Sequence, residues 1–379
     1  MAESAENAPT WRSSFPAMGT RVDIIGWGGD GMAIVNAVVG VVARHEDMWS
    51  VFRPSSEVSQ LNAAVRDAAR GDGTSRCGSD STQAGPGLVV SEETDRLLRD
   101  ALALAEATGG AFNPLIGPLV AAWDVKAMRA AYVAGAPLPP APSEGVVEAA
   151  LRASSWGLLS RVGQRRWAMG IPGESVGGVD APSPSLDLGG IAKGYTADAC
   201  RDLAVAMGAR GVLVSVGTSS VSVFGTRADG SSWRAGLRDP QGGPTSVAGI
   251  VELPAGGMAS LSTSGDNLGP LGVLAPEVVG RAAGSVSDRR ARETSRETSV
   301  GDGRVFDHHI IDPRTGYPAH AGVRQVSVVA SSGVLAEALS TALLVDPSID
   351  VPDVVARWGR ETGTPASAKV VGLVRAEQS

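Results

Sequence analysis

The sequence predicts an α+β fold, in which helices and strands mix without the regular strand–helix alternation of a doubly wound sheet. Apolar residues recur at helical spacing in 32–48 and 334–345, whereas the apolar runs at 211–216 and 220–224 are typical of a β-hairpin. The 379 residues, 43% of them hydrophobic, suffice for one large domain or two intimate ones. The sequence contains no solenoid-type repeat, so a globular domain with a substantial core is expected.

The N-terminal part is expected to hold one strand and three helices. Residues 1–10 are predicted to be a disordered lead, and the alternation over 15–25 predicts a single strand. A helix follows at 32–48 after a glycine-rich turn, and a short helix is predicted at 57–62. Ser91, with two glutamates directly behind it, is a good N-cap for the third helix.

Turn-forming segments separate the later elements. The Pro-rich residues 135–145 predict a linker or a lid-like loop, and Gly217 lies at the centre of the predicted hairpin. The last core elements expected are a strand at 324–330 and the helix at 334–345.

The domain itself is expected to cover residues 11–362. Two polar segments without apolar periodicity, 69–87 and 268–304, are predicted to be surface insertions. Residues 363–379 are expected to be a C-terminal tail.

The chain is acidic, and this excludes some classes of partner. Its formal net charge is -7 and its isoelectric point is near 5.3. A nucleic-acid-binding enzyme with no basic face would be unusual, so we expect no nucleic-acid partner. Cys77 and Cys200 stand alone in the sequence, which predicts neither a disulfide framework nor a zinc site. We expect Cys200 to be a packed core thiol.

The first residues favour a cytoplasmic protein. Residues 1–9 are polar and acidic and lack the basic and apolar regions of a secretory signal peptide. No run of about 18 apolar residues is present, so we expect no membrane insertion.

The most informative segment is 185–195, with the sequence SLDLGGIAKGY. It predicts a short apolar strand, a glycine turn and a helix that ends at Gly208. Free N–H groups and the positive end of the helix dipole at such a start suit an anion such as phosphate. Lys193 lies in the first turn, although the whole chain has only three lysines. Taken alone, the segment is equally consistent with an ordinary strand–turn–helix that carries a surface lysine.

Two side chains on the last predicted helix are candidates for binding a cation. Glu337 and Thr341 are four residues apart and therefore share one helix face. A carboxylate and a hydroxyl are hard oxygen ligands of the kind that Mg²⁺ prefers. Without other information, a solvated helix face is the favoured interpretation.

Two more segments contain side chains suited to chemistry. Residues 308–318 read HHIIDPRTGYP. A histidine in this segment suits three alternative roles, namely a base, a hydrogen-bond donor to phosphate, or a packed edge residue. Residues 109–114 read GGAFNP. An aromatic side chain after a glycine turn is suited to hold a planar ring of a ligand. The alternative is that the glycines only end a helix.

Each motif is weak alone, but their order along the chain is specific. The series also includes FPAMGT at 15–20, FRPSSEVSQLN at 52–62, STSGD at 262–266 and AEALSTA at 336–342. Together, over roughly residues 11–346, these motifs resemble the ApbE family, the FAD:protein FMN transferases.

The resemblance implies an ApbE-like domain of two related α/β halves, with FAD in the cleft between them. It implies an enzyme that transfers FMN from FAD to a Thr or Ser hydroxyl of a target flavoprotein and releases AMP. It also implies that Mg²⁺ is bound by the carbonyl group of Gly190 and by Glu337 and Thr341.

The same resemblance assigns the nucleotide contacts. Lys193 would hold a phosphate, and Asp187 is expected to hydrogen-bond the cofactor. His309 is the candidate for activating the acceptor or binding phosphate. The other residues expected to contact FAD are Met18, Ala111, Phe112 and Asn113.

The chain departs from the family pattern near the expected site. Glu337 stands where the family usually has Asp, which moves the carboxylate by about one bond length. Asn113 stands where Asp is common, Gly217-Thr218 replaces Gly-Gly, and the segment after Asp266 lacks the usual aromatic and Arg residues. Two alternatives therefore stay open: an FAD pyrophosphatase that gives FMN and AMP, and a non-catalytic FAD-binding protein.

Overall fold

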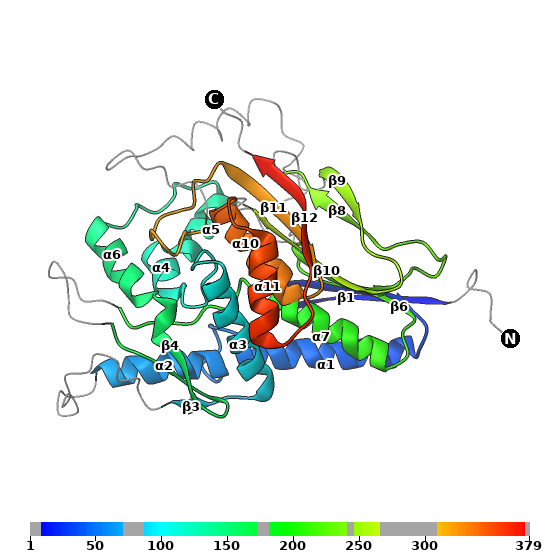
Figure 1. Cartoon of the computed structure of the whole chain (residues 1–379), viewed down its shortest axis with the longest axis horizontal. Helices are drawn as coiled ribbons and strands as arrows, with labels where there is room; N and C mark the ends of the chain where they lie inside the picture. Colours follow the sequence, from blue (N-terminus) through cyan, green and yellow to red (C-terminus); the bar gives the residue numbers. More distant parts are fainter. Residues whose placement is uncertain (1–8, 71–86, 173–181, 241–245, 266–308, 376–379) are drawn as a thin grey trace.

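The computed structural model describes residues 9–70, 87–172, 182–240, 246–265 and 309–375 (Figure 1). Most of the two predicted insertions and of the N-terminal lead lies outside these residues, as do Cys77 and His308.

The strands of the described chain are β1 (Thr10–Ala17), β2 (Thr20–Trp27), β3 (Leu88–Val89), β4 (Leu159–Gly163), β5 (Arg166–Met169), β6 (Gly211–Val216), β7 (Ser220–Gly225), β8 (Arg234–Arg238), β9 (Val247–Glu252), β10 (Met258–Gly265), β11 (Val323–Ala330) and β12 (Ala368–Arg375). The helices are α1 (Gly31–Trp49), α2 (Glu57–Arg70), α3 (Glu92–Ala107), α4 (Gly117–Ala122), α5 (Val125–Ala134), α6 (Glu144–Ala153), α7 (Ala192–Ala206), α10 (Gly333–Val345) and α11 (Val351–Thr362), with a 3-10 turn at Trp156–Leu158.

A seven-stranded sheet forms the centre of the fold, in the order β1-β2-β6-β7-β10-β11-β12. Every neighbouring pair in it is antiparallel, which confirms the α+β class. The predicted hairpin appears as β6 and β7, which pair from Gly211↔Gly225 to Val216↔Ser220. The division into two related halves with a cleft between them stays a prediction.

The helices that carry the predicted site lie on one face of this sheet. α7 packs on β6 and β7, α10 packs on β10 and β11, and the two helices contact each other (Figure 1). The other face of the central strands is covered by the β8–β9 ribbon, with Trp233, Leu237 and Leu253 in the core between them. α1 packs against α7, and Cys200 is fully buried in that layer, as expected. Burial raises the pKa of its thiol to about 12.

The predicted strand at 15–25 is wrong in one respect, because a tight turn divides it. Met18 and Gly19 have φ values of 52° and 66°, and Ala17 pairs with Thr20 across them. Two successive residues at positive φ form the type I′ turn that suits a hairpin. The segment therefore gives two antiparallel strands, β1 and β2.

The helix predictions are confirmed with one change of length. The Ser91 hydroxyl caps α3 by accepting the Thr94 N–H at 3.2 Å. The helix predicted at 57–62 extends to Arg70, because Val58, Leu61 and Val65 continue one buried stripe.

The expected C-terminal tail is wrong for residues 368–375. They form β12, which pairs along the whole of β11 and makes an edge of the sheet. Val370 also packs against the main core cluster. No helix in the described part of the chain is long and apolar enough to cross a membrane.

Candidate functional site

The segment before the glycine turn is extended but is not the predicted strand. Leu186 pairs with the side chain of Asn62, whose Oδ1 accepts the Leu186 N–H at 2.7 Å and whose Nδ2 donates to the Leu186 carbonyl at 3.1 Å. The Asp187 N–H donates to the carbonyl of Pro114 at 3.0 Å. Side-chain and loop partners thus replace a strand ladder, and they anchor the glycine turn to α2 and to the loop before α4.

The helix that follows, α7, begins as predicted, but fewer of the backbone N–H groups at its start are free than expected. The Ala192 N–H is bonded to the Leu188 carbonyl at 2.9 Å, and the Gly189 N–H to the Asp187 carboxylate at 2.9 Å. The Gly194 N–H is bonded to Glu337 Oε2 at 2.9 Å. An anion at this helix start would therefore depend more on the Lys193 side chain than on the backbone.

Lys193 and Glu337 meet beside the glycine turn. The Lys193 ammonium donates to the Gly189 carbonyl at 2.5 Å and lies 3.4 Å from Glu337 Oε1. The Glu337 side chain is 4% exposed, and the Ser220 hydroxyl also donates to its Oε1. A buried carboxylate of this kind needs such partners, because an unpaired charge away from water is costly.

Two glycines allow this meeting. Gly194 on α7 and Gly333 on α10 face each other so closely that a Cβ on either would overlap the backbone of the other. The two helix backbones therefore touch, and Glu337, one turn further along α10, reaches the first turn of α7. The sequence motif contains Gly194 but does not reveal this contact.

Thr341 lies on the same face of α10 as Glu337 and points to the end of β10. Its Oγ1 is 3.0 Å from the Ser264 hydroxyl, which is also 2.8 Å from the Ser340 hydroxyl. Ser220 and Ser264 also lie at the candidate site, although neither is among the site residues predicted from the sequence. The available signal was the alternation of serines in β7 (Ser220 and Ser222) and in β10 (Ser260, Ser262 and Ser264), which makes these strands polar on the face toward the helices.

The described residues contain no group of three or more His, Cys, Asp and Glu side chains arranged to hold a metal ion. A cation at Glu337 would therefore have one carboxylate, with hydroxyl and carbonyl oxygens as its other protein ligands. Such a set fits Mg²⁺, which usually keeps several water ligands. The position already accommodates positive charge, since the Lys193 ammonium lies there.

The residues predicted to contact FAD are only partly brought together. Phe112 lies beside Gly190, where an added Cβ would be 3.7 Å from its ring. Ala111 is buried in the main core, and Met18 packs at its edge. The amide of Asn113 is engaged with backbone, donating to the Ser154 carbonyl at 2.6 Å and accepting the Leu115 N–H at 2.8 Å. These contacts explain a structural role for Asn113, and its contact with FAD stays a prediction.

Asp187 and His309 complete the predicted set. The Asp187 carboxylate accepts a hydrogen bond from the Gly189 N–H. Burial lowers the pKa of Arg129 on α5, and the negative charge of Asp187 partly opposes this effect. Arg129 is thus a cationic neighbour of the turn that the sequence did not indicate. His309 lies before Ile310, whose carbonyl accepts the Ala319 N–H at 2.9 Å. None of the contacts of Lys193 and Glu337 described above involves His309, so its catalytic role stays a prediction.

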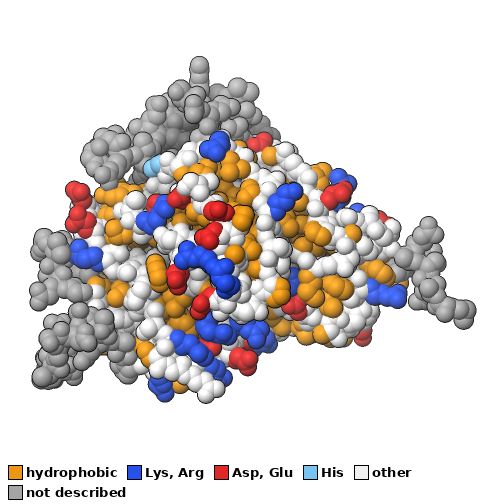
Figure 2. Space-filling view, viewed as in Figure 1, with side chains coloured by type: hydrophobic (Ala, Val, Ile, Leu, Met, Phe, Trp, Pro, Cys, Tyr) orange, Lys and Arg blue, Asp and Glu red, His pale blue; other side chains and the backbone are white. Residues whose placement is uncertain are grey.

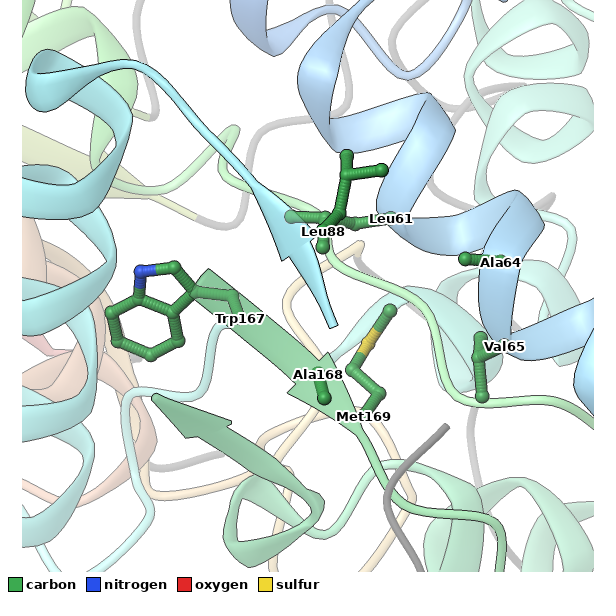
Figure 3. A pocket seen from close by; sticks show the side chains of 7 residues that line it. All are labelled: Leu61, Ala64, Val65, Leu88, Trp167, Ala168 and Met169. Carbon is green, nitrogen blue, oxygen red and sulfur yellow. The ribbon is translucent and has the colours of Figure 1, made fainter. Parts of the chain in front are cut away.

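Two hollows lie near these elements. One of about 10 Å³ is lined by Leu61, Ala64, Val65, Leu88, Trp167, Ala168 and Met169 (Figure 3). It is too small for a ligand such as FAD. A second, open hollow of about 590 Å³ lies over α4 and α6 and is bordered by residues 182–185 and Arg66. None of the residues predicted to bind FAD lines it, although Ser185 is only two positions from Asp187.

The expected absence of a nucleic-acid partner stays a prediction. On the face in Figure 2, acidic and basic side chains are interspersed with apolar ones, and several basic side chains gather in its lower middle.

The fold and the site define an α+β protein in which a glycine turn, a lysine and a buried carboxylate meet at a helix N-terminus. The model of the ApbE family matches residues 18–269 and 278–363. The chain therefore belongs to the ApbE family.

Relatives of known name agree with this assignment. The FAD:protein FMN transferase of Treponema pallidum is 30% identical over 326 residues, which are 83% of this chain and 71% of that protein. That of Rhodobacter capsulatus is 28% identical over 93% of this chain, which spans about half (54%) of that protein's length. Among solved structures, the ApbE protein of Thermotoga maritima superimposes with a TM-score of 0.63 at 25% identity, covering 97% of both chains. The flavin transferase ApbE of Vibrio cholerae gives 0.64 at 21% identity over 98% of both chains, a likeness of fold.

Proposed function

We propose that the protein is an FAD:protein FMN transferase that moves FMN from FAD to a Thr or Ser hydroxyl of a target flavoprotein and releases AMP. Membership of the ApbE family and the names of its relatives support flavin transfer in general. The observation that carries the proposal is the convergence of the Lys193 ammonium and the Glu337 carboxylate beside the glycine turn.

The step requires little covalent chemistry from the protein. The acceptor hydroxyl oxygen forms a bond to the FMN phosphorus, the bond from that phosphorus to the bridging oxygen breaks, and AMP leaves with that oxygen. The hydroxyl proton needs a base, for which His309 is the candidate. Lys193 would neutralise charge on the pyrophosphate as a point charge, while Asp187 orients the nucleotide.

The Glu337 carboxylate, the Thr341 hydroxyl and the Gly190 carbonyl would hold Mg²⁺. When bound, this ion supplies a Lewis acid that withdraws charge from the transferring phosphate. The role of Ser220 is then to orient the Glu337 carboxylate through its hydrogen bond.

The proposal is tested by incubating the purified protein with FAD and Mg²⁺, with and without a domain or peptide that has a Thr acceptor. Chromatography measures AMP, and intact mass measures the acceptor. We expect the acceptor to gain the mass of FMN and this gain to stop on addition of EDTA. A matched acceptor with Thr replaced by Val should gain nothing.

Two other results would replace the proposal. Release of AMP and free FMN at equal rates with and without any acceptor would identify an FAD pyrophosphatase. FAD that binds but stays intact under every condition would identify a non-catalytic binding protein.

A further inference from the structure

The helices α7 and α10 lack side-chain caps of their own. Neither Ile191, which precedes α7, nor Ser332, which precedes α10, caps its helix with its side chain. The first N–H groups of a helix have no partner within it and must find one elsewhere. In both helices, a carboxylate of the other helix supplies this partner.

The two caps are reciprocal. Glu337 of α10 accepts the N–H of Gly194 in the first turn of α7, at 2.9 Å. Asp198 of α7 accepts the N–H of Gly333 at the start of α10, at 2.6 Å. Because Gly194 and Gly333 also touch through their backbones, three contacts fix how far α10 lies along α7.

Asp198 is itself held from several elements. Its Oδ1 accepts hydrogen bonds from the hydroxyls of Ser222 on β7 and Ser260 on β10, both at 2.6 Å, and from Arg201 at 2.9 Å. Its Oδ2 is left for the Gly333 N–H. The carboxylate therefore ties the start of α10 to α7 and to the two central strands at once.

We propose that Asp198 is a positioning residue for the flavin-transfer site, acting on Glu337 through the start of α10. The inference rests on the proposed function, in which Glu337 binds the divalent cation. Loss of the Asp198 cap frees the first turn of α10 and lets Glu337 move relative to Gly194, Ser220 and Lys193. Partners of a metal ligand that fix its orientation typically contribute about 10- to 100-fold to metal affinity.

The test compares Asp198→Asn with Asp95→Asn. Asp95 is a carboxylate on α3 whose side chain is 6% exposed, against 16% for Asp198. It accepts hydrogen bonds from Arg161 at 2.8 Å and from the Trp167 indole at 2.9 Å, and it has no part in the proposed site. Both variants lose hydrogen bonds that a largely buried carboxylate accepts, so both are expected to lower the melting temperature. The readout is Mn²⁺ affinity of the full chain, measured by electron paramagnetic resonance, with Mn²⁺ as an oxygen-preferring probe for Mg²⁺.

We expect Asp198→Asn to weaken Mn²⁺ binding about tenfold and Asp95→Asn to leave it within twofold of the wild type. Ser222→Ala, which removes one donor from Asp198, should weaken it about threefold. If Asp198→Asn does not fold, Ser222→Ala decides the question. The positioning role is overturned if the folded variant, Asp198→Asn or Ser222→Ala, binds Mn²⁺ as tightly as the wild type. It is also overturned if Asp95→Asn loses as much Mn²⁺ affinity as Asp198→Asn.

The two proposals fail in different ways. A wild-type protein that binds no Mn²⁺ and transfers no FMN overturns the proposed function, and the role of Asp198 falls with it. A wild-type protein that binds Mn²⁺ and transfers FMN, together with an Asp198→Asn variant that binds Mn²⁺ equally well, overturns only the inference about Asp198.

Discussion

Single side chains decide the chemistry of the site, and Lys193 is the clearest case. In this structure its ammonium is held by the Gly189 carbonyl and the Glu337 carboxylate. The same charge is available to a phosphate at the start of α7, where much of the backbone donor capacity is already used. The lysine is therefore expected to contribute more to nucleotide binding than the helix itself.

We expect Lys193→Ala to weaken FAD binding about 10- to 100-fold, since a hydrogen bond to a charged group contributes about 1.5–3 kcal/mol. Titration of flavin fluorescence measures the affinity. Lys369→Ala, on the exposed side of β12, is the control and should bind FAD like the wild type. Equal FAD affinity in both variants would contradict the phosphate role of Lys193.

A second residue links stability to pH. Burial between α3 and α11 raises the pKa of Asp100 from 3.8 to about 6, against the opposing charges of Arg99 and Arg96. The folded state therefore holds this proton more tightly than the unfolded state, so the free energy of unfolding falls as the pH rises from about 4 to about 6. Above that range the penalty is fully present.

Asp100→Asn should remove this penalty. We expect the variant to be more stable than the wild type by about 1–2 kcal/mol at pH 8, after allowance for the partial exposure of the group, and equally stable near pH 4. Urea denaturation at several pH values measures the difference. A stability difference between Asp100→Asn and the wild type that is constant at every pH would count against a raised pKa of Asp100.

At the scale of elements, the crossing of α7 and α10 places the site. The crossing depends on the absence of side chains at Gly194 and Gly333, where the two backbones touch. Interiors are packed densely enough that one added carbon here must push the helices apart. Any such shift also changes the distance between Lys193 and Glu337.

We expect Gly333→Ala to lower the free energy of unfolding by about 3 kcal/mol or to prevent folding, through overpacking. Gly40→Ala is a matched control on α1, because an added Cβ there meets no atom within 4 Å. It should raise stability by about 0.5–1 kcal/mol through helix propensity. Thermal and urea denaturation measure both, and a neutral Gly333→Ala variant would contradict the backbone contact.

At the scale of the whole molecule, the last strand closes the sheet. β12 covers β11, which packs directly under α10. Without β12, the backbone of β11 would be an exposed edge, a known route to aggregation.

Deletion of residues 364–379 should therefore destabilise the protein by several kcal/mol and cause self-association, whereas deletion of 376–379 should do neither. The reason is that β12 contributes a full ladder of hydrogen bonds and apolar packing against the core. Thermal denaturation and size-exclusion chromatography distinguish the outcomes. A soluble, monomeric chain ending at residue 363, with unchanged melting temperature, would show that 368–375 behaves as the tail that the sequence predicts.

Local signals in the sequence were enough to predict several of the elements. The periodicity of α1 and α10, the Ser91 cap and the turn at Gly217 were sufficient, because each depends on residues close in the chain. The order of the motifs was likewise enough to identify the family. The start of α7 and the presence of Lys193 in its first turn could also be predicted from residues 185–195.

Only the tertiary structure decided how these pieces meet. Three sets of contacts join residues that are far apart in the chain. They are the pairing of β12 with β11, the hydrogen bonds of the Asn62 side chain to the Leu186 backbone, and the reciprocal caps of Glu337 and Asp198. A polar group that loses water on folding must find a partner, and which partner is near enough depends on how the helices pack on the sheet. For this reason the sequence predicted candidate site residues, whereas the packing of α7 against α10 determined which of them touch.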